Sequence, residues 1–201
     1  MMLAMSSGAR ALPPRRATYA DVEAAPENQV AELIRGALHV MPRPALRHAK
    51  ASSRLTMDIG GPFDRGRGGP GGWIILDEVE LHFPDPTEDG AEDVLVPDLA
   101  GWLRARVPEL PDAAFTTIAP DWICEVVSPS TKDFDRDEKM PVYAREGVRW
   151  AWILDPIAKT LEVYTLNALG RWGEAEVFHD VEMVRAVPFD AIELELSALW
   201  G

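Results

Sequence analysis

The sequence of 201 residues contains one cysteine, few basic residues and no long apolar run. A single cysteine, Cys124, excludes an internal disulfide and a multi-cysteine zinc site, and it favours a reducing, cytoplasmic location. No run of about 18 apolar residues occurs, so we expect no membrane span. Acidic residues outnumber basic ones 33 to 20, for a net charge of -13. This balance argues against non-specific attachment to nucleic acid or anionic lipid.

The composition is typical of one folded domain. Apolar residues make up 47% of the chain, and seven Trp and six Phe supply large groups for a core. Residues 1–16 lack the continuous apolar segment of a secretory signal, because Pro13 and Pro14 interrupt them. We therefore expect a mobile N-terminal tail over residues 1–16 and a single domain over residues 17–201.

The hydrophobic pattern predicts a mixture of helices and strands. Helices are expected at residues 18–23, 45–58 and 133–146, and a hairpin at 30–41 with its turn at Arg35-Gly36. Further strands are expected at 73–83, 94–96, 122–128, 150–154 and 160–166. The glycine-rich residues 60–72 are interpreted as a flexible connector, and apolar residues from Val187 to Trp200 are expected to dock on the core. This order predicts an α+β domain with a mixed sheet.

Two carboxylates lie where a folded core would resist them. Glu125 stands within the apolar run Ile-Cys-Glu-Val-Val, and Asp98 follows a short apolar strand and a proline. A buried carboxylate is costly unless it is paired or bound to metal. If the two strands are neighbours, both groups can hold one cation, and oxygen ligands favour Mg²⁺ or Mn²⁺. The alternative is that each carboxylate caps a turn or pairs with an arginine.

The helix expected at 133–146 adds a positive charge. Asp135, Lys139 and Tyr143 recur at i, i+4 and i+8, so they share one helical face. That face can lie over the carboxylates, where Lys139 would orient a water molecule or stabilise a phosphate. The alternative is an ordinary surface pair between Asp135 and Lys139.

Basic residues gather in one part of the chain despite the acidic total. Two interpretations stay open, a surface that holds a nucleic-acid strand and an ordinary solvated face. The residues are Arg35, Arg43, Arg47, Lys50, Arg54, Arg65 and Arg67.

Several ordered motifs resemble those of the Uma-two family of restriction endonucleases, within the PD-(D/E)XK nuclease superfamily. The motifs are Val-Pro-Asp-Leu-Ala at 96–100, Ala-Pro-Asp-Trp-Ile-Cys-Glu-Val-Val-Ser-Pro-Ser-Thr at 119–131, Asp-Arg-Asp-Glu-Lys-Met-Pro-Val-Tyr-Ala-Arg-Glu-Gly-Val at 135–148 and Trp-Ile-Leu-Asp-Pro at 152–156. The similarity extends upstream through residues 32–36 and His48, and downstream to Leu199-Trp200.

The resemblance implies a restriction-endonuclease-like core, with a mixed central β-sheet flanked by helices and a metal-dependent site. By motif, Asp98 and Glu125 are the metal-binding catalytic acids. The lysine expected two residues after Glu125 is replaced by Val127, so Lys139 is the predicted substitute.

The resemblance also suggests accessory residues and a function. Glu78, His48 and Tyr143 are the candidate accessory residues. The leading hypothesis is a Mg²⁺-dependent endonuclease that hydrolyses phosphodiester bonds of nucleic acid, most readily DNA, and acts as a homodimer without a membrane partner. The alternative is a catalytically inactive binding module with the nuclease fold, which the net charge of -13 favours.

Overall fold

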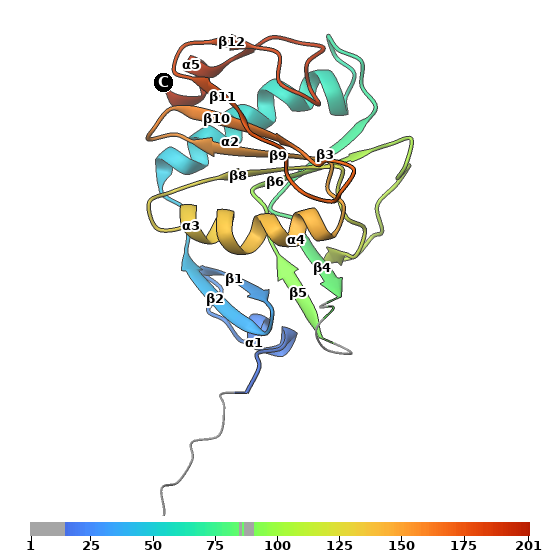
Figure 1. Ribbon diagram of the computed structural model, residues 1–201, viewed down its shortest axis with the longest axis vertical. Coiled ribbons are helices and arrows are strands. Elements are labelled where there is room, and N and C mark those ends of the chain that lie inside the picture. Colours follow the sequence, from blue (N-terminus) through green and yellow to red (C-terminus); the bar gives the residue numbers. More distant parts are fainter. Residues whose placement is uncertain (1–14, 85, 87–90) are drawn as a thin grey trace, which may run out of the picture.

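The computed structural model describes residues 15–84, 86 and 91–201 (Figure 1). Most of the predicted mobile tail, residues 1–14, lies outside these residues. Within them, a six-stranded sheet has the order β11-β10-β9-β8-β6-β3. Strands β8 and β9 are parallel and the other neighbours are antiparallel, so the predicted mixed sheet is confirmed. Its strands are β3 (Trp73–Asp77), β6 (Leu99–Leu103), β8 (Trp122–Val126), β9 (Trp150–Asp155), β10 (Thr160–Thr165) and β11 (Glu176–His179).

A second, five-stranded sheet has the order β2-β1-β5-β4-β7. It begins with the predicted hairpin, whose turn places Arg35 and Gly36 at positive φ. A short antiparallel pair, β12 (Met183–Val184) and β13 (Leu194–Glu195), lies near the C-terminus. The strands of the second sheet are β1 (Gln29–Ile34), β2 (Ala37–Pro42), β4 (Glu80–Pro84), β5 (Glu92–Leu95) and β7 (Phe115–Thr116).

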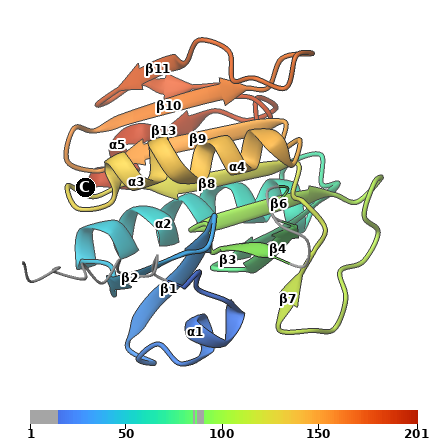
Figure 2. The same cartoon turned by 60° about the horizontal axis from the view of Figure 1, so that its bottom comes forward.

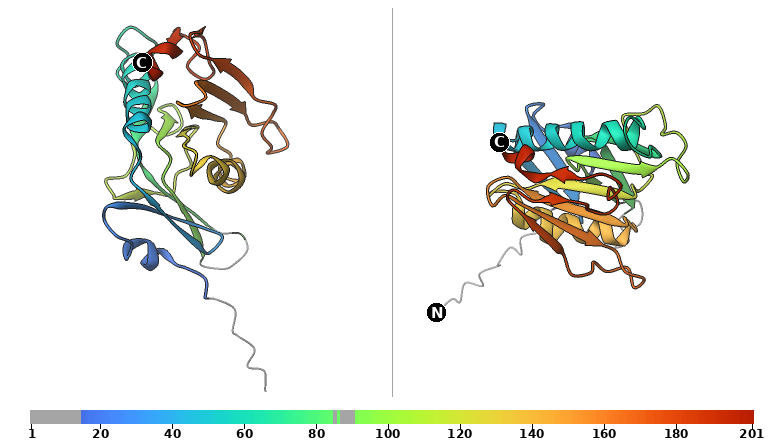
Figure 3. Two further views of the ribbon diagram at one scale, coloured as in Figure 1. Left: turned by 90° about the vertical axis from the view of Figure 1, so that its left-hand side faces the viewer. Right: turned by 90° about the horizontal axis from the view of Figure 1, so that it is seen from above.

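Helices cover both faces of the six-stranded sheet (Figures 1 and 3). Helix α2 lies on one face and the segment from α3 to α4 lies on the other. In the part of the chain that the structure describes, no helix is long and apolar enough to cross a membrane. The helical elements are α1 (Tyr19–Glu23), α2 (Leu46–Ile59), a π-helical turn (Gly60–Asp64), α3 (Lys132–Phe134), a second π-helical turn (Asp135–Lys139), α4 (Met140–Arg145) and α5 (Leu196–Trp200).

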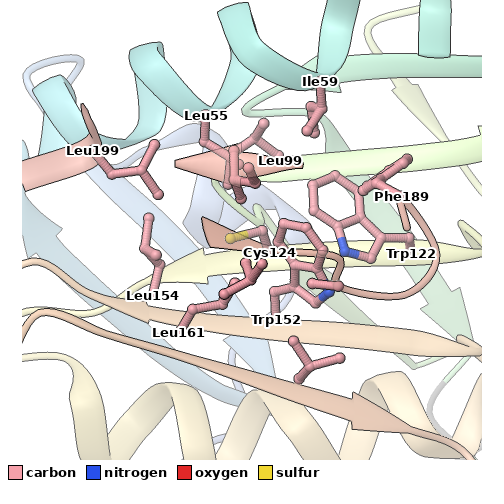
Figure 4. Packing of buried hydrophobic residues seen from close by; sticks show 14 of the residues in the cluster. Leu55, Ile59, Leu99, Trp122, Cys124, Trp152, Leu154, Leu161, Phe189 and Leu199 are labelled. Carbon is pink, nitrogen blue, oxygen red and sulfur yellow. The ribbon is translucent and has the colours of Figure 1, made fainter. Parts of the chain in front are cut away.

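The first hydrophobic core lies between α2 and the six-stranded sheet (Figure 4). Leu55 from α2 packs in one cluster with Trp122 and Trp152 from the sheet. The C-terminal segment adds Phe189 and Leu199, so the expected docking of that segment is confirmed. Alternate residues of β8 therefore point to this face.

The second core lies between the opposite face of the same sheet, α4 and the five-stranded sheet. Ile123 and Ile153 contribute from β8 and β9, Tyr143 from α4 and Leu95 from β5. Since Ile123 and Val127 both belong to this second core, Glu125, which lies between them, points to the same side.

Two local predictions are wrong. The single strand expected over 73–83 is divided into β3 and β4, which belong to different sheets. The chain turns at Glu78, which adopts a φ of 48°. The glycine-rich segment does not begin as a connector, because Gly60–Asp64 extends α2 by a π-helical turn that buries Phe63 against Phe189. The apolar contact of Phe63 outweighs the low helix propensity of glycine.

Candidate active site

Glu125 is a carboxylate on the central strand β8, and its side chain is only 2% exposed. Burial raises its pKa well above the usual range, and the carboxylates of Asp135, Asp98 and Glu32 raise it further, while Lys139 acts in the opposite direction. Glu125 therefore depends on the neighbouring Lys139 ammonium group to hold its charge in this buried position. The sequence pattern correctly identified this residue as an acid within a buried strand.

Lys139 supplies the cation. Its Nζ atom lies 2.8 Å from Oε1 of Glu125 and 3.0 Å from Oε1 of Glu32, with Oδ1 of Asp135 at 3.7 Å. Burial alone lowers the pKa of Lys139, but the three carboxylates outweigh it and hold the pKa well above the usual value. Lys139 is therefore a buried, charged ammonium group. The surface pair between Asp135 and Lys139 that the spacing left open is wrong, because both side chains are buried.

Tyr143 fixes the orientation of Glu125 from one helical turn beyond Lys139. Its hydroxyl donates a hydrogen bond to Oε1 of Glu125 at 2.6 Å, and the residue is fully buried. Burial and the nearby Glu125 raise the pKa of Tyr143 well above its usual value, so the phenol remains a donor. The predicted helical face of residues 135, 139 and 143 thus meets β8.

Asp98 lies between β5 of one sheet and β6 of the other. Its Oδ2 accepts the N–H of Val126 at 2.7 Å, and its Oδ1 lies 3.2 Å from Nε2 of His48. Its backbone carbonyl accepts the N–H of Glu78 at 3.2 Å. Burial lowers the pKa of His48, but the hydrogen bond and charge of Asp98 outweigh this effect and raise it. Asp98 is therefore held beside Glu125 by the backbone of the next residue, Val126.

Glu32 on β1 is a site residue that the sequence reasoning missed. It is fully buried, and its Oε1 accepts the N–H of Val96 at 2.7 Å in addition to contacting Lys139. Its Oε2 has no hydrogen-bond partner among the described residues. The signal was available, because Glu32 stands in the apolar run Val-Ala-Glu-Leu-Ile, the pattern that identified Glu125.

These groups border one cavity of about 800 Å³. The β1–β2 hairpin, the beginning of α2 and α3 lie on the same side of the molecule (Figures 1 and 2). The candidate residues in its wall are Glu32, His48, Glu78, Asp98, Glu125 and Lys139, whereas Tyr143 lies behind Glu125 rather than in the wall. The structure therefore brings all the predicted site residues to one place.

The donor set fits a hard cation bound by few protein ligands. No group of three or more His, Cys, Asp or Glu side chains within residues 15–84, 86 and 91–201 is arranged to hold a metal ion. Mg²⁺ commonly uses one or two carboxylates and completes its shell with water and substrate phosphates. Asp98 and Glu125, which border the same cavity, are two carboxylates of the kind that requirement calls for. A closed cage made only of protein ligands does not fit.

A mixed sheet with helices on both faces is the restriction-endonuclease-like fold that the sequence motifs predict. A solved structure with this fold is described as a "putative nuclease belonging to DUF820" from Anabaena variabilis ATCC 29413. It superposes with a TM-score of 0.70 over 91% of this chain and 97% of that one, at 24% sequence identity.

The chain belongs to the Uma2 family, which is described as "Putative restriction endonuclease" and matches residues 16–198. The expected family and fold are thus confirmed. No match was found among curated proteins.

Proposed function

We propose that the protein is a Mg²⁺-dependent endonuclease that hydrolyses phosphodiester bonds of DNA. The observation that carries this proposal is the 2.8 Å contact between Nζ of Lys139 and Oε1 of Glu125, in a cavity that Asp98 also borders. An acid pair beside a fixed ammonium group is the arrangement that phosphodiester hydrolysis needs, because negative charge develops on the attacked phosphate.

Asp98 and Glu125 are the residues that would hold Mg²⁺ or Mn²⁺. Such an ion, when bound, supplies Lewis acidity and lowers the pKa of a bound water. The two acids are prepared by their neighbours, since His48 and the Val126 N–H orient Asp98 and Tyr143 orients Glu125. Fixed ligands of this kind bind a metal with less loss of side-chain entropy.

Lys139 would act on the phosphate or on the attacking water. Its ammonium group is held by Glu32 and Glu125, which come from two different sheets. A charge fixed before the substrate arrives needs no reorganisation in the transition state. Glu32 is thus a positioning residue that holds the amine in place.

A catalytically inactive binding module is the second candidate. The observation that favours it is the excess of acid, with a net charge of -13 and a cavity wall that contains many more carboxylates than cations. Phosphates approach such a wall only with compensating cations.

Cleavage of mixed DNA and RNA with Mg²⁺ or Mn²⁺ separates the two candidates. We expect wild-type protein to cut, Lys139→Met to lose at least a hundredfold in rate, and Lys159→Met to behave as wild type. Lys159 is a matched control because it is an exposed lysine paired with Asp180. Binding of nucleic acid without any cutting would favour the binding module. A cytoplasmic location and a homodimer stay predictions.

A further inference from the structure

The strongest feature that the site does not use is a stretch of chain without acids. Between Glu32 and Asp58 the sequence contains no Asp or Glu, although acidic residues outnumber basic ones elsewhere. This stretch includes the β2 strand and nearly all of α2. A local excess of positive charge on an acidic protein is a recognisable feature of a phosphate-binding surface.

The structure divides the basic residues of this region into used and unused groups. Arg35 lies 3.5 Å from Glu138, and Arg54 donates hydrogen bonds to the carbonyls of Ala198 and Gly201. These two guanidinium groups therefore have structural partners.

Three other cations lie together at the beginning of α2. Arg43 borders the cavity and donates a hydrogen bond to the backbone carbonyl of Glu27, with no acidic side chain as its partner among the described residues. Arg47 and Lys50 are exposed and have no acidic partner in the described part of the chain. We call Arg43, Arg47 and Lys50 the α2 basic surface.

The α2 basic surface lies beside the site residues. His48, which contacts Asp98 at 3.2 Å, is the direct neighbour of Arg47 in the chain. Arg47, His48 and Lys50 all belong to the first turns of α2, so the surface lies at the end of the helix that borders the cavity. Arg47 and Lys50 are three residues apart in α2, so they lie on the same side of the helix.

We propose that the α2 basic surface holds the phosphate backbone of the nucleic-acid strand next to the phosphate that is cut. This inference rests on the proposed function and names where its substrate lies. The cavity wall is acidic, so a polyanion needs positive charge at the entrance as well as a cation inside. Arg43 supplies this charge at the cavity, and Arg47 and Lys50 continue it outwards.

A matched pair of double variants tests the proposal. Arg47→Ala/Lys50→Ala removes two positive charges from the surface, whereas Arg65→Ala/Arg67→Ala removes two exposed charges beyond the other end of α2, about 20 Å away. Arg47 and Lys50 lie in α2, where alanine favours helix, and Arg65 and Arg67 are exposed after the helix, so both double variants are expected to retain the fold. Far-ultraviolet circular dichroism and thermal unfolding check that expectation.

Binding is measured separately from cutting. Fluorescence anisotropy with a labelled DNA duplex and its single strand is recorded at several salt concentrations, with Ca²⁺ in place of Mg²⁺. We expect Arg47→Ala/Lys50→Ala to weaken binding of the duplex at least about tenfold. The slope of log binding constant against log salt concentration should become less steep by about 1.8, because each lost phosphate contact contributes about 0.9. The Arg65→Ala/Arg67→Ala protein is expected to bind as wild type.

Each outcome decides one claim. Equal weakening by both double variants, or no weakening by Arg47→Ala/Lys50→Ala, would overturn the α2 basic surface even if the protein cuts DNA. Selective weakening without any cutting in Mg²⁺ or Mn²⁺ would support the surface and overturn the nuclease proposal. A wild-type protein that neither binds nor cuts nucleic acid would overturn both.

Discussion

Lys139 contacts Glu125 from the helical segment that follows the strand, and not from the strand itself. The position two residues after Glu125 is occupied by Val127, which packs in the second hydrophobic core. The lysine reaches the same carboxylate from the π-helical turn Asp135–Lys139, with a distance of 2.8 Å between Nζ and Oε1. The charge is thus retained at the site while the strand position is used for packing.

Lys139→Met is expected to destabilise the fold. The substitution leaves Glu32, Glu125 and Asp135 buried around an apolar side chain, and loss of one partner of a buried ion pair costs about 3–5 kcal/mol. The free energy of unfolding is measured by urea denaturation. Lys159→Met, at an exposed pair, is the control and is expected to change it by less than about 1 kcal/mol.

A rescue variant sharpens this result. Lys139→Met/Glu125→Gln removes one of the buried negative charges that Lys139→Met leaves without a cation. The double variant is therefore expected to be more stable than Lys139→Met alone. If the double variant is the less stable one, the charge imbalance is not the cause of the loss.

Tyr143→Phe is expected to retain the fold and to reduce activity. The ring still packs in the second core, but Oε1 of Glu125 loses the 2.6 Å hydrogen bond. Loss of a hydrogen bond to a charged group costs about 1.5–3 kcal/mol. Urea denaturation measures the stability and a cleavage assay measures the rate. An unchanged cleavage rate would contradict the claim that Tyr143 orients Glu125 for catalysis.

Asp98→Asn and Glu125→Gln are expected to weaken Mn²⁺ binding, since each replaces a negative oxygen with an amide of the same shape. Isothermal titration calorimetry with Mn²⁺ alone measures the affinity. Glu174→Gln, at an exposed position outside the cavity wall, is the matched control. Identical titrations of the wild type and all three variants would contradict the metal site.

The three tyrosines are expected to ionise at a higher pH than free tyrosine. The hydrogen bond to Glu80 raises the pKa of Tyr19 to about 12, and burial with the Glu162 hydrogen bond raises the pKa of Tyr164 to about 12. The pKa of Tyr143 is also raised, by burial and Glu125. A raised pKa favours the neutral phenol, so this stabilisation is complete below the unfolded pKa of about 10 and is lost as the pH rises towards about 12.

Absorbance of tyrosinate during an alkaline titration measures this effect. The native protein is expected to show no ionisation near pH 10, and the urea-unfolded protein is the control in which all three tyrosines ionise there. One equivalent of tyrosinate near pH 10 in the native state would contradict the hydrogen bonds to Glu80, Glu125 or Glu162.

Much of the site was predictable because its signals are local. Helical spacing alone placed Asp135, Lys139 and Tyr143 on one face, and an acid within an apolar strand identified Glu125. Glu32 also stands within an apolar strand, but the pattern of residues 30–41 indicates a hairpin and says nothing of a partner for this carboxylate. The contact between Glu32 and Lys139 depends on how the two sheets pack against each other, and the hydrophobic periodicity of the sequence does not determine that packing.

The division of residues 73–83 was not predictable from alternation. Val79, Leu81 and Phe83 continue the period of a strand, and the positive φ occurs at Glu78 rather than at a glycine. The strand β6 was missed for a related reason, because Leu99–Leu103 contains Ala and Gly in place of β-branched residues. Glycine at position 101 also leaves room for the ring of Trp122, since a Cβ there would lie 3.1 Å from it, a tight contact.

The chain passes between the two sheets at Glu78, and it passes again at Asp98, whose carbonyl accepts the Glu78 N–H. Lys139 then connects Glu32 of one sheet with Glu125 of the other. The candidate catalytic residues therefore connect the two sheets and also form the proposed reaction centre. If the two sheets shifted relative to each other, the Lys139 ammonium group would lose its contact with Glu32 or Glu125. A change that loosens the packing of the sheets is therefore expected to lower the activity of the site as well.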